Sequence, residues 1–425
     1  MERYFGLIGI AVILSIAFMM SNNKRRINIR TVITGLVLQL LLGFFILKVP
    51  LGQVVFNSIG TFITKLLNYS DQGARFVFGP LADTDKMGAV FGMANSVVIF
   101  IKFITTIILV AVLVSIGYHF GIIQRVISVL SRGVYWLMGV SGSEALSNVS
   151  SAFVGQVEAQ IMIKPYLEGM TNSELLASMT GSMACIAGGV MAIYISFGIP
   201  ASYLLAASLM AAPGALVISK IVFPETELSQ TRGMVKLQVK KLHYNLLDAI
   251  SSGASDGLRI GLNVIAMLIG FIALLALVNS GLGFLGRWLA HYMSWSAINI
   301  DLNHLSLDSL LGNIFSSFAY VMGVPGKDVQ TAGSLMGTKL VANEFIAYHD
   351  FAGIIKSGQL SPKTITIVSF ALCGFANFSS IGIQVGGISQ LAPGRRGDLA
   401  RLGFKALICG TLASYLSAAI AGILM

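Results

Sequence analysis

The sequence contains little charge. Charged residues make up 11% of its 425 residues, against about 25% in an ordinary soluble domain. Hydrophobic residues make up 55%, and the mean hydropathy is +0.82. A soluble fold of this length needs polar side chains to cover its surface, so the composition excludes a soluble globular enzyme and a disordered protein. It favours an all-α polytopic membrane protein, whose outer surface meets lipid instead of water.

Cysteine and the common catalytic motifs are also scarce. The three cysteines, Cys185, Cys373 and Cys409, lie in apolar stretches and form no CxxC pair, which excludes a disulfide framework. No GxxxxGK[ST] or HExxH motif occurs and the five histidines are dispersed, so we expect neither an ATP-driven pump nor an enzyme, and no cofactor. The net charge of +10 is better explained by basic cytoplasmic loops than by a nucleic-acid partner.

The apolar runs predict eight transmembrane helices. They cover residues 5–20, 32–47, 87–121, 179–197, 203–223, 261–282, 366–388 and 402–424. Basic loops follow the first, third, fifth and seventh of these runs. Positively charged loops stay on the cytoplasmic side, so this alternation predicts that both termini lie outside. Residues 50–86 mix polar and apolar side chains, which predicts an interfacial helix.

Two further apolar stretches are each broken by polar residues. Residues 142–168 are interrupted at Gly155-Gln-Val-Glu158, and residues 328–355 are interrupted at Asn343-Glu344. Each side of a break has about ten residues, or ~15 Å of helix, which is half a bilayer. The pattern therefore predicts two re-entrant hairpins.

The two predicted hairpins begin two similar segments. Glu158 precedes Cys185 by 27 residues, and Glu344 precedes Cys373 by 29. An odd number of predicted crossings separates the hairpins, so the two copies would be inverted. Inverted repeats with broken helices are typical of secondary transporters; the alternative is a chance similarity between two apolar hairpins.

Glu158 and Glu344 are carboxylates inside apolar hairpins, which makes each a candidate functional residue. The alternative is a structural carboxylate bonded to the amides of its own broken helix. The polar residues nearby both donate and accept hydrogen bonds: Gln156, Asn343, Asn377, Ser379 and Ser380. No arginine lies near either break, so the pattern predicts a neutral ligand rich in hydrogen-bond donors. Lys339 is interpreted as a lysine at a helix end or one that reaches towards water.

Four stretches resemble the concentrative nucleoside transporter family. They are Phe153-Val-Gly-Gln-Val-Glu-Ala; Ala192-Ile-Tyr-Ile-Ser-Phe-Gly with Phe223-Pro-Glu-Thr-Glu; Leu340-Val-Ala-Asn-Glu-Phe-Ile-Ala-Tyr; and Ala371-Leu-Cys-Gly-Phe-Ala-Asn-Phe-Ser-Ser-Ile-Gly-Ile-Gln. The resemblance implies a homotrimer of eight-span protomers that works by an elevator-type movement. The expected units are N-terminal spans with an interfacial and a scaffold helix (1–141), the first repeat (142–223), a cytoplasmic loop with an interfacial helix (224–260), a scaffold span (261–327) and the second repeat (328–425).

The resemblance also implies a nucleoside site. Gln156 and Glu158 would hydrogen-bond the nucleobase, and Val190 would pack against it. The positions that match the ribose contacts are Glu344, Asn377 and Ser380, and Phe375 matches an aromatic that lines the pocket. Val157 stands where the family usually has threonine, which removes one hydroxyl contact and leaves the base preference open.

The coupling ion is the second open point. The sodium cage of the family would correspond to Ser151, the Val154 carbonyl, Cys185 and the Ile186 carbonyl. The family has asparagine at the first position and serine or threonine at the third, and a thiol is a poor ligand for Na⁺. We therefore expect cation-coupled nucleoside uptake across the bacterial cytoplasmic (inner) membrane, with H⁺ slightly favoured over Na⁺. A sodium-coupled symporter and a passive nucleoside channel are the alternatives.

Overall fold

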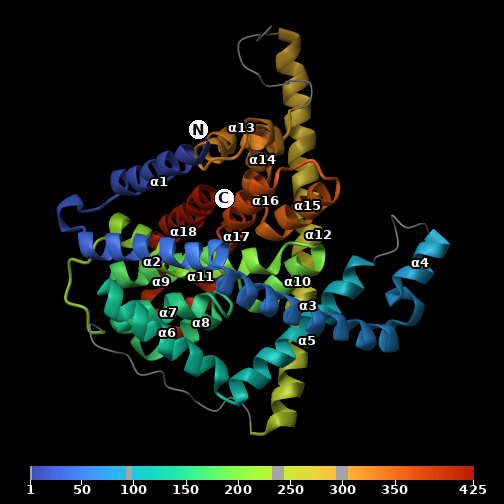
Figure 1. Ribbon diagram of the computed structural model, residues 1–425, viewed down its shortest axis with the longest axis horizontal. Helices are drawn as coiled ribbons and strands as arrows, with labels where there is room; N and C mark the ends of the chain where they lie inside the picture. The colour runs from blue at the N-terminus through green and yellow to red at the C-terminus, as the bar shows by residue number, and fades with distance from the viewer. Residues whose placement is uncertain (1, 92–97, 232–243, 293–304) are drawn as a thin grey trace.

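The computed structural model describes residues 2–91, 98–231, 244–292 and 305–425, and all regular elements in these ranges are helices (Figure 1). The α-helices are α1 (Glu2–Met19), α2 (Ile29–Lys48), α3 (Pro50–Phe78), α4 (Thr84–Phe91), α5 (Ile99–His119), α6 (Ile122–Met138), α7 (Gly142–Ser151), α8 (Glu158–Ile161), α9 (Asn172–Ala184), α10 (Gly188–Phe197), α11 (Ala201–Val222), α12 (Leu246–Tyr292), α13 (Leu307–Val321), α14 (Val329–Val341), α15 (Glu344–Lys356), α16 (Pro362–Ala371), α17 (Phe378–Leu391) and α18 (Arg396–Leu424).

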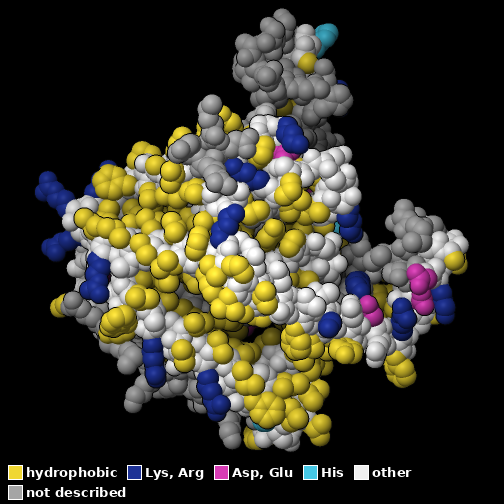
Figure 2. Space-filling view, in the orientation of Figure 1, with side chains coloured by type: hydrophobic (Ala, Val, Ile, Leu, Met, Phe, Trp, Pro, Cys, Tyr) yellow, Lys and Arg dark blue, Asp and Glu magenta, His cyan; other side chains and the backbone are white. Residues whose placement is uncertain are grey.

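The surface is that of a membrane protein. Large hydrophobic side chains are exposed on most of the outer helices, and Figure 2 shows them spread widely over one face instead of forming a small patch. Six helical segments of the described residues are long and apolar enough to cross a bilayer. They are Ile29–Lys48, Phe100–His119, Asn172–Phe197, Ala201–Val222, Ile272–His291 and Pro393–Leu424. The prediction of a polytopic helical membrane protein is thus confirmed; the count of eight spans stays a prediction.

Two predicted spans are not continuous helices. The run 179–197 is divided between α9 and α10 by a break at residues 185–187, and the run 366–388 is divided between α16 and α17 by a break at residues 372–377. Hydropathy does not detect these breaks, because each apolar run continues across its break. Irregular backbone is tolerated at membrane depth where protein surrounds it. Cys185 and Cys373, one in each break, are fully or almost fully buried.

Each predicted hairpin consists of two short helices that meet at the polar tip. In the first, α7 ends at Ser151 and α8 begins at Glu158; in the second, α14 ends at Val341 and α15 begins at Glu344. Both carboxylates are therefore the first residue of the second helix, where the helix dipole favours a negative charge. This matches the correspondence between Glu158 and Glu344 that the sequence predicts.

The two breaks lie against each other at the centre of the molecule. Gly374, in the second break, has φ +99°, and a Cβ at this position would lie 2.4 Å from the carbonyl oxygen of Ala184, at the start of the first break. Only glycine allows this close approach with this backbone conformation. Helix α18 packs against both α9 and α16, so the centre is enclosed by protein.

Helix α12 is the longest described element, with 47 residues, and it extends beyond the body of the molecule at both ends in Figure 1. The predicted boundary at 260/261 falls inside this continuous helix. Its first half packs closely against α5: a Cβ at Gly253 or Gly257 would lie within 3 Å of α5 backbone atoms. Small residues spaced by four are a common way for membrane helices to approach closely.

The N-terminal helix α1 packs along the C-terminal helix α18. Gly6 lies against the side chain of Ile423 and the carbonyl of Ala419. The first residues of α1 and the last residues of α18 therefore lie at the same end of the bundle.

Candidate functional site

A buried carboxylate lies at the tip of the second hairpin. Glu344 is 5% exposed, and Asn343, just before it, caps α15 by accepting a hydrogen bond from the Ile346 N–H at 2.9 Å. The Glu344 carboxylate accepts two hydrogen bonds from other elements: from Asn377 Nδ2 at 2.7 Å and from the Tyr194 hydroxyl at 3.3 Å. Residues from the hairpin tip, α10 and the second break thus converge on one carboxylate.

Asn377 connects this carboxylate to the start of α17. Its Oδ1 accepts hydrogen bonds from the Ser380 N–H at 2.9 Å and the Ser379 hydroxyl at 2.7 Å. These donors fix the amide so that Nδ2 faces Glu344. The asparagine therefore caps the broken helix and orients the carboxylate at the same time. Of the residues predicted to bind ribose, Glu344 and Asn377 are in direct contact, and Ser380 is bonded to Asn377.

Two stacked tyrosines, Tyr194 and Tyr348, lie next to the Glu344 carboxylate. The rings of Tyr194 and Tyr348 are stacked with centroids 4.3 Å apart, and both are fully buried. The Tyr348 hydroxyl donates to the Ser369 carbonyl at 2.7 Å. Tyr194 belongs to one of the sequence stretches that resemble the family, and in the structure it donates to one oxygen of Glu344 while Asn377 donates to the other.

The tip of the first hairpin lies against α17. A Cβ at Gly387 would come 2.6 Å from the Val157 side chain, and Gln384 Nε2 donates to Gln156 Oε1 at 3.4 Å. Gln156 and Val157 are partly exposed, and Glu158 is exposed. The two hairpin carboxylates therefore differ in environment: Glu344 is buried and hydrogen-bonded, whereas Glu158 is accessible.

The two apolar residues predicted to line the pocket are also near the breaks. Val190 is in the first turn of α10, and Phe375 is in the break before α17; both are partly buried and pack against the core. The helix α17 thus carries contacts to both hairpin tips. Apolar side chains together with polar groups at two tips suit a neutral ligand with a ring and several hydroxyls.

The four residues of the possible sodium cage lie at one buried junction between the first hairpin and the first break. The Gly188 N–H donates to the Phe153 carbonyl at 3.2 Å, which joins the two segments. The Ser151 hydroxyl lies 2.8 Å from the Ser147 carbonyl and 3.0 Å from Ser182 Oγ. The Cys185 thiol is 3.6 Å from the Ser208 carbonyl. Ser151, where the family has asparagine, and Cys185, where the family has serine or threonine, thus both lie at this junction.

Lys339 lies in the last turn of α14, as the prediction of a lysine at a helix end has it, but its ammonium contacts the second break and does not reach towards water. Its side chain is 1% exposed. The ammonium donates to the carbonyls of Ala371 and Cys373 at 2.9 and 3.0 Å. The first is an acceptor that α16 leaves free where it ends, and the second also accepts from the Ser414 hydroxyl. It is also near enough to attract the Glu344 carboxylate. A lysine five residues before a hairpin carboxylate is the sequence signal for this role.

Replacing Lys339 with methionine is expected to lower the melting temperature of the purified protein and to weaken nucleoside binding about tenfold. The substitution leaves the Ala371 carbonyl without a donor, which costs about 1–3 kcal/mol, and removes a positive charge that attracts the Glu344 carboxylate. Lys356→Met, at an exposed lysine on α15, is the control and should change neither property. An unchanged melting temperature in Lys339→Met would show that the ammonium does not stabilise the break.

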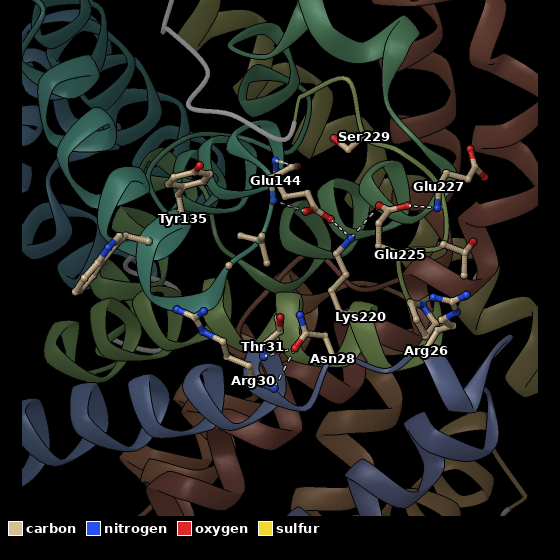
Figure 3. A pocket seen from close by; sticks show the side chains of 16 residues that line it. Arg26, Asn28, Arg30, Thr31, Tyr135, Glu144, Lys220, Glu225, Glu227 and Ser229 are labelled. Atoms are coloured by element: carbon tan, nitrogen blue, oxygen red, sulfur yellow. Dashed lines mark hydrogen bonds and ion pairs between the residues drawn. The ribbon is translucent and has the colours of Figure 1, made fainter.

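A second set of charges anchors the base of the first hairpin (Figure 3). The Lys220 ammonium lies between two carboxylates: it forms an ion pair with Glu144 of α7 and another with Glu225 at 3.4 Å. Glu225 also accepts a hydrogen bond from the Thr171 hydroxyl at 2.8 Å. A cavity of about 660 Å³ adjoins this network. Because these charges are already paired, we assign the Phe223-Pro-Glu-Thr-Glu stretch to anchoring the hairpin.

The fold and the convergence of two hairpin tips on a broken helix are those of a membrane transporter. Family descriptions match most of the chain: "Na+ dependent nucleoside transporter C-terminus" at residues 203–422, the corresponding N-terminus at 8–81, and a nucleoside-recognition "Gate" region at 100–201. The chain belongs to the concentrative nucleoside transporter family. This confirms the resemblance on which the sequence prediction rests.

Three relatives span nearly the whole chain. The transporter YutK of Bacillus subtilis is 44% identical and covers 99% of each chain. The nucleoside permease NupC of Helicobacter pylori is 38% identical, covering 99% of this chain and 97% of its own. The solved structure of CNTnw in an inward-facing substrate-bound state is 40% identical, with a TM-score of 0.92 over 100% of this chain and 98% of that one. These relatives are transporters, which agrees with the prediction that the chain is not an enzyme.

Proposed function

We propose that this protein takes up nucleosides across the bacterial cytoplasmic membrane by cation-coupled symport, as a homotrimer with an elevator-type movement. The observation that carries this proposal is the buried Glu344–Asn377 pair where a hairpin tip meets a broken helix. A carboxylate and an amide side by side accept from and donate to neighbouring hydroxyls, which is the arrangement that a ribose requires. Glu344, Asn377 and Ser380 would bind the ribose; Gln156, Val157, Glu158, Val190 and Phe375 would surround the base.

The membrane topology belongs to the same proposal. Eight spans with both termini outside place the two ends of the chain on one side. The packing of Gly6 against Ile423 supports an even number of crossings, and the basic loops after alternate spans support the orientation. The division into two inverted repeats, a cytoplasmic loop and scaffold spans rests on the same arrangement.

Accumulation in proteoliposomes tests the transport mechanism. With an imposed cation gradient, labelled uridine or adenosine should rise above its external concentration, and unlabelled nucleosides should compete. A passive nucleoside channel would only equalise the two concentrations. Equalisation without accumulation under both a proton and a sodium gradient would therefore contradict symport.

For the coupling ion we favour H⁺ slightly over Na⁺. The serine and thiol at Ser151 and Cys185 offer Na⁺ fewer oxygen ligands than an amide and a hydroxyl would. Glu158 and Glu344 are the titratable groups at the hairpin tips that a proton route would use. The description of the family as Na⁺-dependent favours the alternative, a sodium-coupled symporter whose cage includes the Val154 and Ile186 carbonyls.

The double substitution Ser151→Asn with Cys185→Ser is expected to increase the share of uptake that depends on sodium, because it replaces a hydroxyl with an amide carbonyl oxygen and a thiol with a hydroxyl oxygen, both better ligands for Na⁺. Uptake is measured with each gradient imposed separately, with and without a protonophore. Cys409→Ser, which changes another buried thiol, is the matched control. Full activity of the unmodified protein on Na⁺ alone at constant pH, insensitive to the protonophore, would overturn the proton assignment and leave nucleoside transport standing.

A further inference from the structure

Gln384, a buried amide on α17, contacts the tip of the first hairpin. Gln384 has no exposed surface and lies on the same face of α17 as Ser380, one turn further along the helix. Its Nε2 donates to the Met179 carbonyl of α9 at 3.2 Å and to Gln156 Oε1 at 3.4 Å. Gln384 thus connects α17, which carries the proposed ribose contact Ser380, to Gln156, which is proposed to hydrogen-bond the base.

The direction of the hydrogen bond between Gln384 and Gln156 follows from the contact of Gln384 with the Met179 carbonyl. A carbonyl oxygen only accepts hydrogen bonds, so the Gln384 side chain must turn its NH₂ group towards Met179. The second hydrogen of that NH₂ group then points to Gln156, so Gln156 must accept this hydrogen bond with its Oε1. As a result, the NH₂ group of Gln156 remains available, and the hairpin tip presents a donor to a ligand.

We propose that Gln384 is a positioning residue that sets base preference: it fixes the orientation of the Gln156 amide and so decides which atoms of the base this tip can recognise. The proposal rests on the proposed function of the site, in which Gln156 contacts the base. In the fixed orientation the tip favours bases with an acceptor, such as a carbonyl oxygen or an unprotonated ring nitrogen. Without Gln384 the Gln156 amide can turn to present either its NH₂ group or its oxygen. Bases with an acceptor at this place and bases with a donor there should then bind with more similar affinity.

Binding to the purified, full-length protein tests the proposal. The probes are uridine, cytidine, adenosine and inosine, which present different donors and acceptors on their bases, and 3′-deoxyuridine, which changes only the sugar. Gln384→Leu keeps a similar volume and removes the hydrogen bonds. We expect the ratios of affinity among the four bases to change by about three- to tenfold, the range that one neutral hydrogen bond supports, while the ratio of uridine to 3′-deoxyuridine stays unchanged.

Introducing Gln384→Leu into a Gln156→Ala variant distinguishes an effect on the orientation of the Gln156 amide from a general loss of packing. In Gln156→Ala, the amide on which Gln384 acts is absent, so adding Gln384→Leu should change the base ratios no further. A change of the same size in both backgrounds, or unchanged ratios in Gln384→Leu alone, would overturn the proposal. If the unmodified protein binds none of the nucleosides, the proposed function itself fails, which is a distinguishable result.

Discussion

Glu344→Gln is expected to weaken uridine binding ten- to hundredfold while the protein still folds. The carboxylate accepts hydrogen bonds from Asn377 and Tyr194 on two sides, and it has lone pairs left for ribose hydroxyls. An amide keeps one acceptor oxygen and places an NH₂ group where the other oxygen was. Charge-assisted hydrogen bonds of about 1.5–3 kcal/mol correspond to roughly this loss of affinity.

The measurement is uridine titration of the purified variant, with the melting temperature as a check of folding. Asp350→Asn provides a matched control, because Asp350 lies on the same helix α15 and its side chain is 52% exposed. It should leave the affinity unchanged. Unchanged affinity in the folded Glu344→Gln protein would remove Glu344 from the ribose contacts.

Gly374→Ala is expected to destabilise the whole protein. The backbone of Gly374 has φ +99°, which costs other residues about 1–3 kcal/mol. The added methyl group would also lie 2.4 Å from the Ala184 carbonyl, and relieving such a contact in a packed core costs about 1–3 kcal/mol more. The two breaks must then separate, so nucleoside binding should fall together with stability.

Gly382→Ala is the control for this experiment. Gly382 lies on α17, a few residues further on, and a Cβ there would meet no atom within 4 Å. Alanine is the better helix former, so this variant should be as stable as the unmodified protein or slightly more stable. Equal melting temperatures for the two variants would show that the crossing of the breaks is not tightly packed.

The membrane class and the family could be predicted from the sequence, because both depend on local patterns; the two re-entrant hairpins stay a prediction. A run of apolar residues predicts a span, and a carboxylate within such a run predicts a tip. Glu158 and Glu344 are indeed both the first residue of a second hairpin helix. The resemblance also predicts Asn377 as a ribose contact, and the structure places its amide against Glu344.

The contacts between distant segments could not be predicted in the same way. Gln384 meets Gln156 across 228 positions of the chain, and Tyr194 meets Glu344 across 150. Nothing in the hydropathy of residues 179–197 or 366–388 shows where these helices break, because the breaks are stabilised by partners such as Lys339 and not by local composition. The different environments of Glu158 and Glu344 likewise depend on which helices cover each tip.

The length of α12 has a consequence for the lipid around the protein. A helix of 47 residues is about 70 Å long, whereas the hydrocarbon core of a bilayer is about 30 Å thick. Even a tilt of about 40° leaves much of it outside that layer. Its first half is attached to α5, but only 6% of the apolar segment Ile272–His291 is buried. The 20 residues of this segment make about 30 Å of helix, which matches that hydrocarbon core, so a bilayer with shorter or longer acyl chains would change the tilt of α12.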